Sequence, residues 1–432
     1  MKNGPAARNP GSNTIAAKRV LVLTADAGFG HRSAAKAVVA ALEETCGEGC
    51  HVEMINPLDD ERVPALLRES QSDYDKLVQE MPRLYELGYG VSDAAIGGAF
   101  VDGALVVILF EVMRSILQRY RPDAIVTTYP LYQAPLSTVR VVDRYHVPLL
   151  TVVTDLAAVH RLWFHKRVDL CMVPTEAARV QAVDQGLDPQ KVHVTGIPVH
   201  PDLARDWERS ALRTSLGWQP DLFAALAVGS KRVGNLRDTL RALNHSGLPL
   251  QLIAVAGGDD ELYRHLQGVE WHREVQVHNF VRNLPDMMHA ADCIVCKAGG
   301  LIVAESLACG LPLLLIDVLP GQETGNADYV VEHGAGDLAP DPLDALETMY
   351  DWLAHDRALL VERSRNAQRL GRPRSAYAVA ERVWAAAQRG PRQRRGYSAG
   401  KRRGLIAMLD RHGVSWRTQP SAGRWPSQPR HE

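Results

Sequence analysis

LVLTADAGFGHRSAAKAVVAA, residues 21–41, places a glycine turn between a short apolar run and an alanine-rich stretch. This order predicts a β-strand, a tight loop and a helix, with the N–H groups at the helix start open to an anionic ligand. A dinucleotide fingerprint would need a third glycine after Gly28 and Gly30, but position 33 is Ser33. The incomplete fingerprint argues against an NAD site and leaves a parallel α/β unit that binds another ligand.

Short apolar runs alternate with amphipathic stretches along most of the 432 residues, as in parallel α/β proteins. Strands are expected at 19–24, 51–55, 124–127, 149–153, 170–173, 193–195, 223–228, 250–256, 275–278, 293–295 and 313–316. This pattern predicts two Rossmann-like domains, joined by a linker region at 200–220. The expected division is a flexible N-terminus at 1–18, an N-terminal domain at 19–200, a C-terminal domain at 201–388 with closing helices at 343–354 and 377–388, and a basic flexible tail at 389–432.

Charge is unevenly distributed, although 49 basic and 50 acidic residues give a net charge of only −1. Residues 389–432 carry a net charge of +9 and residues 1–19 carry +4, so the body between them carries −14. The tail is also rich in Gly, Pro, Ser and Gln, which predicts a flexible segment. It is either a solvated segment without a partner or a tether to anionic lipid or nucleic acid.

No segment predicts export or a membrane span. The first nineteen residues lack a continuous apolar core, and the apolar window 94–117 carries Asp102, Glu111 and Arg114. The long insertion at 59–112 therefore either fills a core, which we favour, or touches a membrane surface. We expect a cytoplasmic protein.

Six cysteines suit a reducing compartment better than a disulfide framework. Cys293 and Cys296 have the spacing of a metal or redox pair. They lie in an expected strand, however, where residues three apart face opposite sides, so both are interpreted as core residues.

The first candidate for chemistry is His31, at the junction of the glycine loop and its helix. Open α/β sheets bind ligands in the crevice beyond the carboxyl ends of their strands, where this junction lies. A histidine with an ordinary pKa near 6.5 can accept a proton at neutral pH, as a general base must. The alternative is a capping or surface histidine.

A second cluster begins with CKAGGLIVAESLACGLP, residues 296–312. Gly299 and Gly300 end an expected strand and open a helix, so N–H groups and the helix dipole can face a diphosphate. Glu305, farther along that helix, can reach the vicinal hydroxyls of a ribose. Gln322, Glu323 and Asn326 follow the next strand and suit the hydroxyls of a sugar.

These windows resemble GT-B glycosyltransferases of family 28, which have two Rossmann-like domains facing a central cleft. A third window, VTDLAAVHRLWFHKRV at 153–168, resembles the diacylglycerol branch, including the galactolipid synthases, more than the peptidoglycan branch. The resemblance implies an acceptor side of Gly28, Phe29, Gly30, Asp155, His160 and Trp163, with His31 as catalytic base. It implies a donor site of Gly229, Ser230, Phe280, Val281, Gly299, Gly300, Glu305, Gln322, Glu323 and Asn326.

The implied reaction is inverting transfer of a hexose from UDP-galactose, or less favourably UDP-glucose, to the sn-3 hydroxyl of diacylglycerol. No cofactor or essential metal is expected, because helix N–H groups would stabilise the departing UDP. Asp73 and Asp75 form an Asp-Tyr-Asp sequence that we interpret as a solvated helix face. The implied partners are these substrates and an anionic membrane surface, to which the enzyme would bind peripherally.

Three alternatives stay open. The first is transfer of the sugar to another lipid, such as a peptidoglycan precursor. The second is a nucleotide-sugar oxidoreductase or epimerase, which would need the complete glycine fingerprint. The third is a non-catalytic binder of anionic lipid or nucleic acid, which would leave His31 and Glu305 unexplained; no nucleic acid is expected as a partner.

Overall fold

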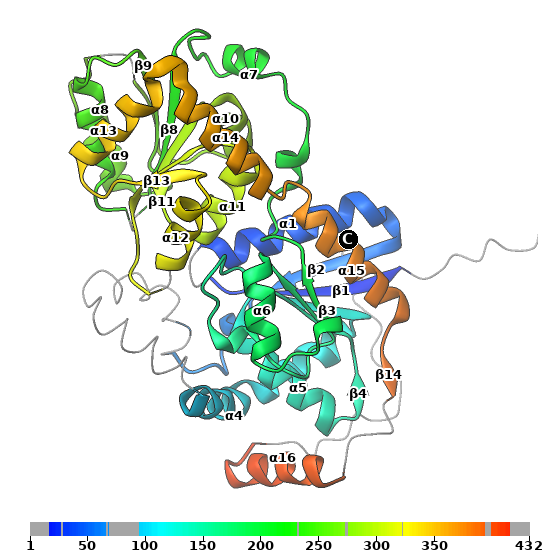
Figure 1. Ribbon diagram of the computed structural model, residues 1–432. Helices are drawn as coiled ribbons and strands as arrows, with labels where there is room; N and C mark the ends of the chain where they lie inside the picture. Colours follow the sequence, from blue (N-terminus) through cyan, green and yellow to red (C-terminus); the bar gives the residue numbers. More distant parts are fainter. Residues whose placement is uncertain are drawn as a thin grey trace, which may run out of the picture.

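A computed structural model describes residues 17–26, 29–65, 68, 95–230, 233–272, 275–321, 323–393 and 399–414. Its two halves are each built on a sheet of parallel strands, one above the other in the view of Figure 1. The expected α/β architecture is confirmed.

The sheet of the first half has six parallel strands in the order β2-β1-β3-β5-β6-β7. Their bounds are β1 (Lys18–Leu23), β2 (Cys50–Ile55), β3 (Ala124–Thr127), β5 (Leu149–Val152), β6 (Leu170–Val173) and β7 (Val192–Val194). The central strands are continuous apolar runs because helices cover both faces. Val20 and Val22 pack toward α1 (Phe29–Cys46), whereas Leu21 and Leu23 pack toward α4 (Ala95–Tyr120) and α5 (Gln133–Val142).

The sheet of the second half has six parallel strands in the order β10-β9-β8-β11-β12-β13. Their bounds are β8 (Phe223–Val228), β9 (Leu250–Val255), β10 (Val275–His278), β11 (Cys293–Lys297), β12 (Leu313–Asp317) and β13 (Gly336–Leu338). The strand order reverses between β8 and β11, so a crevice opens at the carboxyl ends of these two strands. One face carries α8 (Leu236–His245) and α13 (Pro342–Leu353), and the other carries α10 (Leu284–Ala290) and α11 (Gly300–Ala308).

The expected strands match the observed ones closely, and the additional strands are short. β13 has three residues, and β4 (Tyr145–His146) pairs with β14 (Arg392–Gln393) in a small antiparallel ribbon. The core interpretation of the two cysteines is confirmed. Cys293 packs against the α8 and α13 face and Cys296 against the α10 and α11 face, as alternation along a strand requires.

The last helix assigned to the second domain, α15 (Ser375–Arg389), lies on the first half instead. It runs beside α1 and covers the first sheet (Figure 1). Ala376, Val379 and Val383 are fully buried there against the core that contains Val20 and Val22. An apolar stripe in a sequence shows that a helix will be buried, but not against which sheet.

The chain therefore passes between the halves twice, after β7 and again before α15, and the two crossings touch. The backbone N–H of Val199 donates to the Ser375 hydroxyl at 3.1 Å. Gly196 has a φ of +87°, and a Cβ at this position would lie 2.8 Å from Cβ of Arg372. Glycine is therefore required where the crossings meet.

The prediction of a flexible tail is wrong for part of its length, because residues 399–411 form helix α16 (Ala399–Arg411). Leu409 is fully buried in the core of the first half, and Leu405 and Met408 pack against it. Arg402 Nε also donates to the carbonyl of Val142 at 3.1 Å. The prediction rested on the net charge and composition of residues 389–432 as a whole, which do not reveal that Leu405, Met408 and Leu409 share one apolar face. Residues 1–16 and 415–432 lie outside the described residues.

The insertion after β2 contributes α4, whose second half supports the core interpretation. Leu105, Leu109, Phe110 and Met113 are buried in the core of the first half. Within the described part of the chain, no helix combines the length and apolar character needed to cross a membrane. Residues 69–94, which include Asp73 and Asp75, lie outside the described residues.

Candidate active site

His31 lies in the first turn of α1, at the carboxyl end of the first sheet. Its Nδ1 atom is 2.9 Å from Oγ1 of Thr154, the second residue after β5. The edge of the Tyr129 ring meets the imidazole at 5.1 Å between centroids, and the Trp163 ring lies at 5.9 Å. The imidazole therefore contacts two aromatic rings, and Thr154 supplies a hydroxyl partner at Nδ1.

Hydroxyl groups just beyond neighbouring strands hold this turn in place. The Thr128 hydroxyl, after β3, donates to the carbonyl of His31 at 2.9 Å and lies 3.2 Å from the Thr24 hydroxyl, after β1. The Tyr132 hydroxyl donates to the carbonyl of Thr24 at 3.1 Å. Because carboxyl ends of parallel strands meet at one edge, residues distant in the chain converge on His31.

Asp155 and Trp163 form a pair beside His31. Trp163 Nε1 donates to Asp155 Oδ2 at 2.7 Å, and this fixes the ring that faces the imidazole. Burial raises the pKa of Asp155 to about 6, against the opposing hydrogen bonds from Trp163 and the backbone at His160. Carboxyl groups lose hydration when buried, so their neutral form is favoured.

His160 is buried and has a structural role in the same loop. Its Nδ1 accepts from the backbone N–H of Leu162 at 3.2 Å, capping the short turn η4 (Arg161–Trp163). Of the other acceptor-side candidates, Gly30 precedes His31 in α1. Gly28 and the side chain of Phe29 lie outside the described residues.

The start of α11 lies against the loop that carries Thr154. A Cβ at Gly300 would lie 2.9 Å from the carbonyl oxygen of Thr154, so only glycine permits this approach of the two backbones. Nearby, a Cβ at Gly325 in α12 (Thr324–Glu332) would lie 2.6 Å from Cβ of Ala158. The two halves thus meet at the helix start that was predicted to hold a diphosphate, next to the partner of His31.

Glu305 is partly buried in α11, and its side-chain carboxyl forms no hydrogen bond or ion pair with the described residues. Burial raises its pKa to about 8. A partly buried carboxyl group that accepts no hydrogen bond from the protein is unusual, because buried polar groups nearly always have hydrogen-bond partners. This side chain can accept hydrogen bonds from a ligand.

Glu323 and Asn326 are buried and bound to neighbouring loops. Glu323 accepts from Lys297 Nζ through one oxygen and from the backbone N–H of Leu319 through the other, at 3.1 Å for the latter. The Asn326 side chain donates to the carbonyl of Ala298 at 2.9 Å. Both residues therefore brace the loops after β11 and β12, while Gln322 lies outside the described residues.

The remaining donor candidates lie beyond β8 and β10. Gly229 is buried after β8, where a Cβ would lie 2.7 Å from Leu236, and Ser230 follows it. Phe280 is 66% exposed, and Val281 is partly buried beside it. An exposed phenyl ring next to a crevice offers an apolar surface for a flat ring.

Sequence reasoning missed the side chains that hold His31, namely Thr154, Thr128 and Tyr129. Their only signal is their position directly after the expected strands 149–153 and 124–127, because hydroxyl residues are common in loops and form no recognisable motif. Among the residues that the structure describes, no group of three or more His, Cys, Asp or Glu side chains could hold a metal ion.

Comparison with known families gives two matches that together cover most of both halves. Residues 31–199 match the model of monogalactosyldiacylglycerol (MGDG) synthase, and residues 228–347 match the C-terminal domain of glycosyltransferase family 28. His31, Asp155 and Trp163 lie within the first match, and Glu305 lies within the second.

Curated relatives give the same result over most of the chain. The chain is 34% identical to a chloroplastic monogalactosyldiacylglycerol synthase from Spinacia oleracea, over 84% of this chain and 71% of that protein. It is 32% identical to a probable chloroplastic monogalactosyldiacylglycerol synthase 2 from Oryza sativa subsp. japonica, over 86% of this chain and 81% of that protein.

Solved structures show the fold. MurG of Acinetobacter baumannii matches with a TM-score of 0.55 at 15% identity, covering 85% of this chain and 99% of that one. A calicheamicin glycosyltransferase also matches at 0.55 and 15% identity, over 86% and 99%. The UDP-GlcNAc 2-epimerase of Neisseria meningitidis, bound to UDP-GlcNAc, matches at 0.56 and 13% identity, over 85% and 100%. The fold is GT-B, and since it serves both transferases and epimerases, function must be argued from the site.

Proposed function

Because this chain belongs to the monogalactosyldiacylglycerol synthase family of glycosyltransferases, we propose that it transfers galactose from UDP-galactose to the sn-3 hydroxyl of diacylglycerol. The observation that carries the proposal is the position of His31. Its imidazole is held by Thr154, and Thr154 in turn contacts the start of α11. A base for the acceptor and a helix N-terminus for the donor phosphates therefore lie side by side.

His31 acts as the general base. When its Nδ1–H donates to the Thr154 hydroxyl, Nε2 carries the lone pair that takes the proton of the acceptor hydroxyl. The acceptor oxygen then forms a bond to the anomeric carbon as the bond from that carbon to the UDP oxygen breaks. The proton ends on His31, and the configuration at the anomeric carbon inverts.

The second half holds the donor. N–H groups at the start of α11 face the diphosphate and stabilise the charge that develops on departing UDP. Glu305 accepts from the ribose hydroxyls, since its carboxyl has no partner in the described residues. The uracil ring lies at Phe280 and Val281, and the phosphates also approach Gly229 and Ser230. Gln322, Glu323 and Asn326 surround the sugar.

The acceptor lies on the first half and comes from a membrane surface. Asp155 fixes the indole of Trp163 beside His31, and this ring offers a face to the glycerol or the sugar. His160 shapes the loop between them. The basic tail attracts anionic headgroups and keeps the enzyme peripherally attached.

One assay tests the reaction. Purified protein is offered radiolabelled UDP-galactose or UDP-glucose with detergent-dispersed diacylglycerol, and the lipid product is separated. We expect a galactolipid with the β configuration at the sn-3 position. Exclusive use of UDP-glucose would contradict the choice of sugar, and absence of any lipid product with either donor would overturn the proposal.

The proposed stabilisation of UDP by α11 requires no metal ion. Turnover in excess EDTA should therefore equal turnover in excess Mg²⁺. A loss of activity in EDTA that Mg²⁺ restores would show that a metal shares this role.

A further inference from the structure

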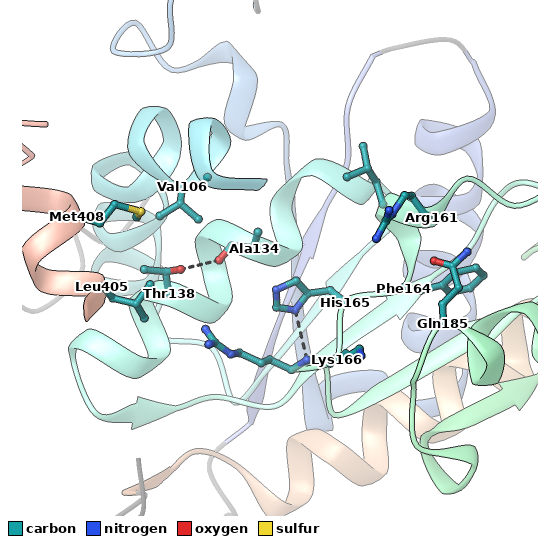
Figure 2. A pocket seen from close by; sticks show the side chains of 13 residues that line it. Val106, Ala134, Thr138, Arg161, Phe164, His165, Lys166, Gln185, Leu405 and Met408 are labelled. Carbon is teal, nitrogen blue, oxygen red and sulfur yellow. Dashed lines mark hydrogen bonds between the residues drawn. The ribbon is translucent and has the colours of Figure 1, made fainter. Parts of the chain in front are cut away.

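A cavity of ≈ 450 Å³ lies in the first half, between α4, α5, the loop around η4 and helix α16. Figure 2 shows Leu405 and Met408 of α16 on one side, facing Val106 of α4, with Arg161 and Lys166 on the other. None of the residues that line it belongs to the candidate active site. Arg161, Leu162 and Phe164 line the cavity, but Trp163, whose ring contacts His31, does not.

The polar wall of the cavity is basic. Arg161, Lys166 and Arg167 line it, and no acidic side chain does. Lys166 and Arg167 are exposed, and in the described part of the chain neither forms an ion pair. His165 adds no charge at neutral pH, because burial, Arg167 and Arg140 lower its pKa to about 4. The wall therefore attracts an anion.

The opposite wall is largely apolar and comes from α4, α5 and helix α16 of the tail. Leu405 and Met408 are partly buried, and Val106 is 5% exposed. The volume corresponds to about fifteen water-sized groups, taking about 30 Å³ for each. This space suits most of one acyl chain, with its head at the exposed Lys166 and Arg167, but not two chains. Helix α16 also lies beyond residue 347, where the family match ends.

We propose that this cavity binds an anionic lipid with a single acyl chain, a lysophospholipid with a phosphate head. The phosphate lies at Arg161, Lys166 and Arg167, and the chain lies along Val106, Phe164 and Met408. The site is separate from the acceptor site beside His31. Its ligand bridges α16 to the first half, so binding stabilises the docked position of this helix.

Calorimetric titration of the full-length protein with monomeric lysophosphatidic acid tests the charged wall. We expect one molecule bound per chain, and a loss of about tenfold or more in affinity for Lys166→Glu combined with Arg167→Glu. The matched control reverses two exposed arginines of the second half, Arg241→Glu with Arg365→Glu, and should bind as the wild type does. Equal weakening in both pairs would overturn the site.

A second pair of variants tests the apolar wall. Met408→Glu places a charge in the cavity and should weaken binding, whereas Ala407→Glu changes an exposed position of the same helix and should not. Thermal unfolding of each variant with and without the lipid should show stabilisation by lysophosphatidic acid only where it binds. Equal effects of Met408→Glu and Ala407→Glu would contradict a chain that lies in the cavity.

Other ligands separate the alternatives. Equal affinity for uncharged monoacylglycerol would overturn the role of the basic wall, and equal affinity for inorganic phosphate would overturn the role of the chain. Binding to vesicles of diacyl phosphatidic acid without binding of the monomeric single-chain lipid would identify a membrane-contacting surface instead. None of these measurements uses sugar transfer, so their failure is distinguishable from failure of the proposed reaction.

Discussion

At the scale of single residues, His31 carries the proposed chemistry. His31→Ala should reduce transfer by about two to four orders of magnitude, the usual contribution of a general base, while the affinity for UDP stays nearly unchanged. Turnover and calorimetric binding of UDP measure the two effects separately. His51→Ala, which changes an exposed histidine on β2, is the control. Retained turnover in His31→Ala would refute the assignment of the base.

Thr154 is a positioning residue for His31. Thr154→Val keeps the shape of the side chain but removes the hydroxyl that contacts Nδ1, and should lower kcat about tenfold by one lost hydrogen bond. Thr154→Ser restores the hydroxyl and should recover most of the rate. A structural defect alone would change thermal stability without shifting the pH profile of kcat. An unchanged pH profile in Thr154→Val would contradict the proposed contact.

The proposed contact of Glu305 with the ribose should make the affinity for UDP depend on pH. With a pKa of about 8 in the empty site, its carboxyl is mostly protonated at pH 7. Ribose hydroxyls donate to the ionised form, so binding lowers the pKa and releases a proton. Affinity should therefore rise between about pH 6 and pH 8 and level off above, where the free carboxyl is already ionised. Calorimetry at several pH values should find this slope in the wild type and a flat profile in Glu305→Gln.

At the scale of secondary-structure elements, the contact between α11 and the loop after β5 should set the distance between the proposed base and the proposed donor. Gly300→Ala brings a methyl group within about 3 Å of the Thr154 carbonyl, which forces these elements apart. We expect kcat/KM to fall at least about tenfold, because misplacement of reacting groups by an ångström is costly. Gly404→Ala in α16, where a Cβ would meet no atom within 4 Å, should have no such effect. Equal activity of both variants would contradict the coupling.

The bounds of strands could be predicted from the sequence better than the packing of helices against particular sheets. Strands buried on both faces form continuous apolar runs, so 124–127, 170–173 and 223–228 were predicted with the observed bounds. The packing of α15 on the first half depends on a contact between segments over three hundred residues apart, which periodicity does not record. In the candidate site, the glycines and charged residues could be predicted because they form sequence motifs. Thr154 and Tyr129 could not, because they belong to no motif and come to the site only through their position after a strand.

At the scale of the whole molecule, the tail divides into a docked helix and a basic end. A chain that ends at residue 414 keeps α16 but loses Arg417, Arg424 and Arg430, and should bind anionic vesicles more weakly while retaining the thermal stability of the full chain. A chain that ends at residue 388 also uncovers the core around Leu409, and should unfold at a lower temperature. Vesicle sedimentation and thermal unfolding measure the two effects. Equal stability of the two truncations would contradict the docking of α16.

The double crossing between the halves has a mechanical consequence. The segments before and after the second half touch where Val199 meets Ser375, so the halves are joined along one line and not by a loose tether. Rotation of one half about that line would move the start of α11 away from the first half and keep this contact. Sliding of one half past the other would break the contact between Val199 and Ser375. A hinge is therefore the motion that this connection permits. The same connection makes the halves inseparable by a single cut: a fragment that ends at residue 200 would lack α15 and expose the face of the first sheet that contains Val20 and Val22.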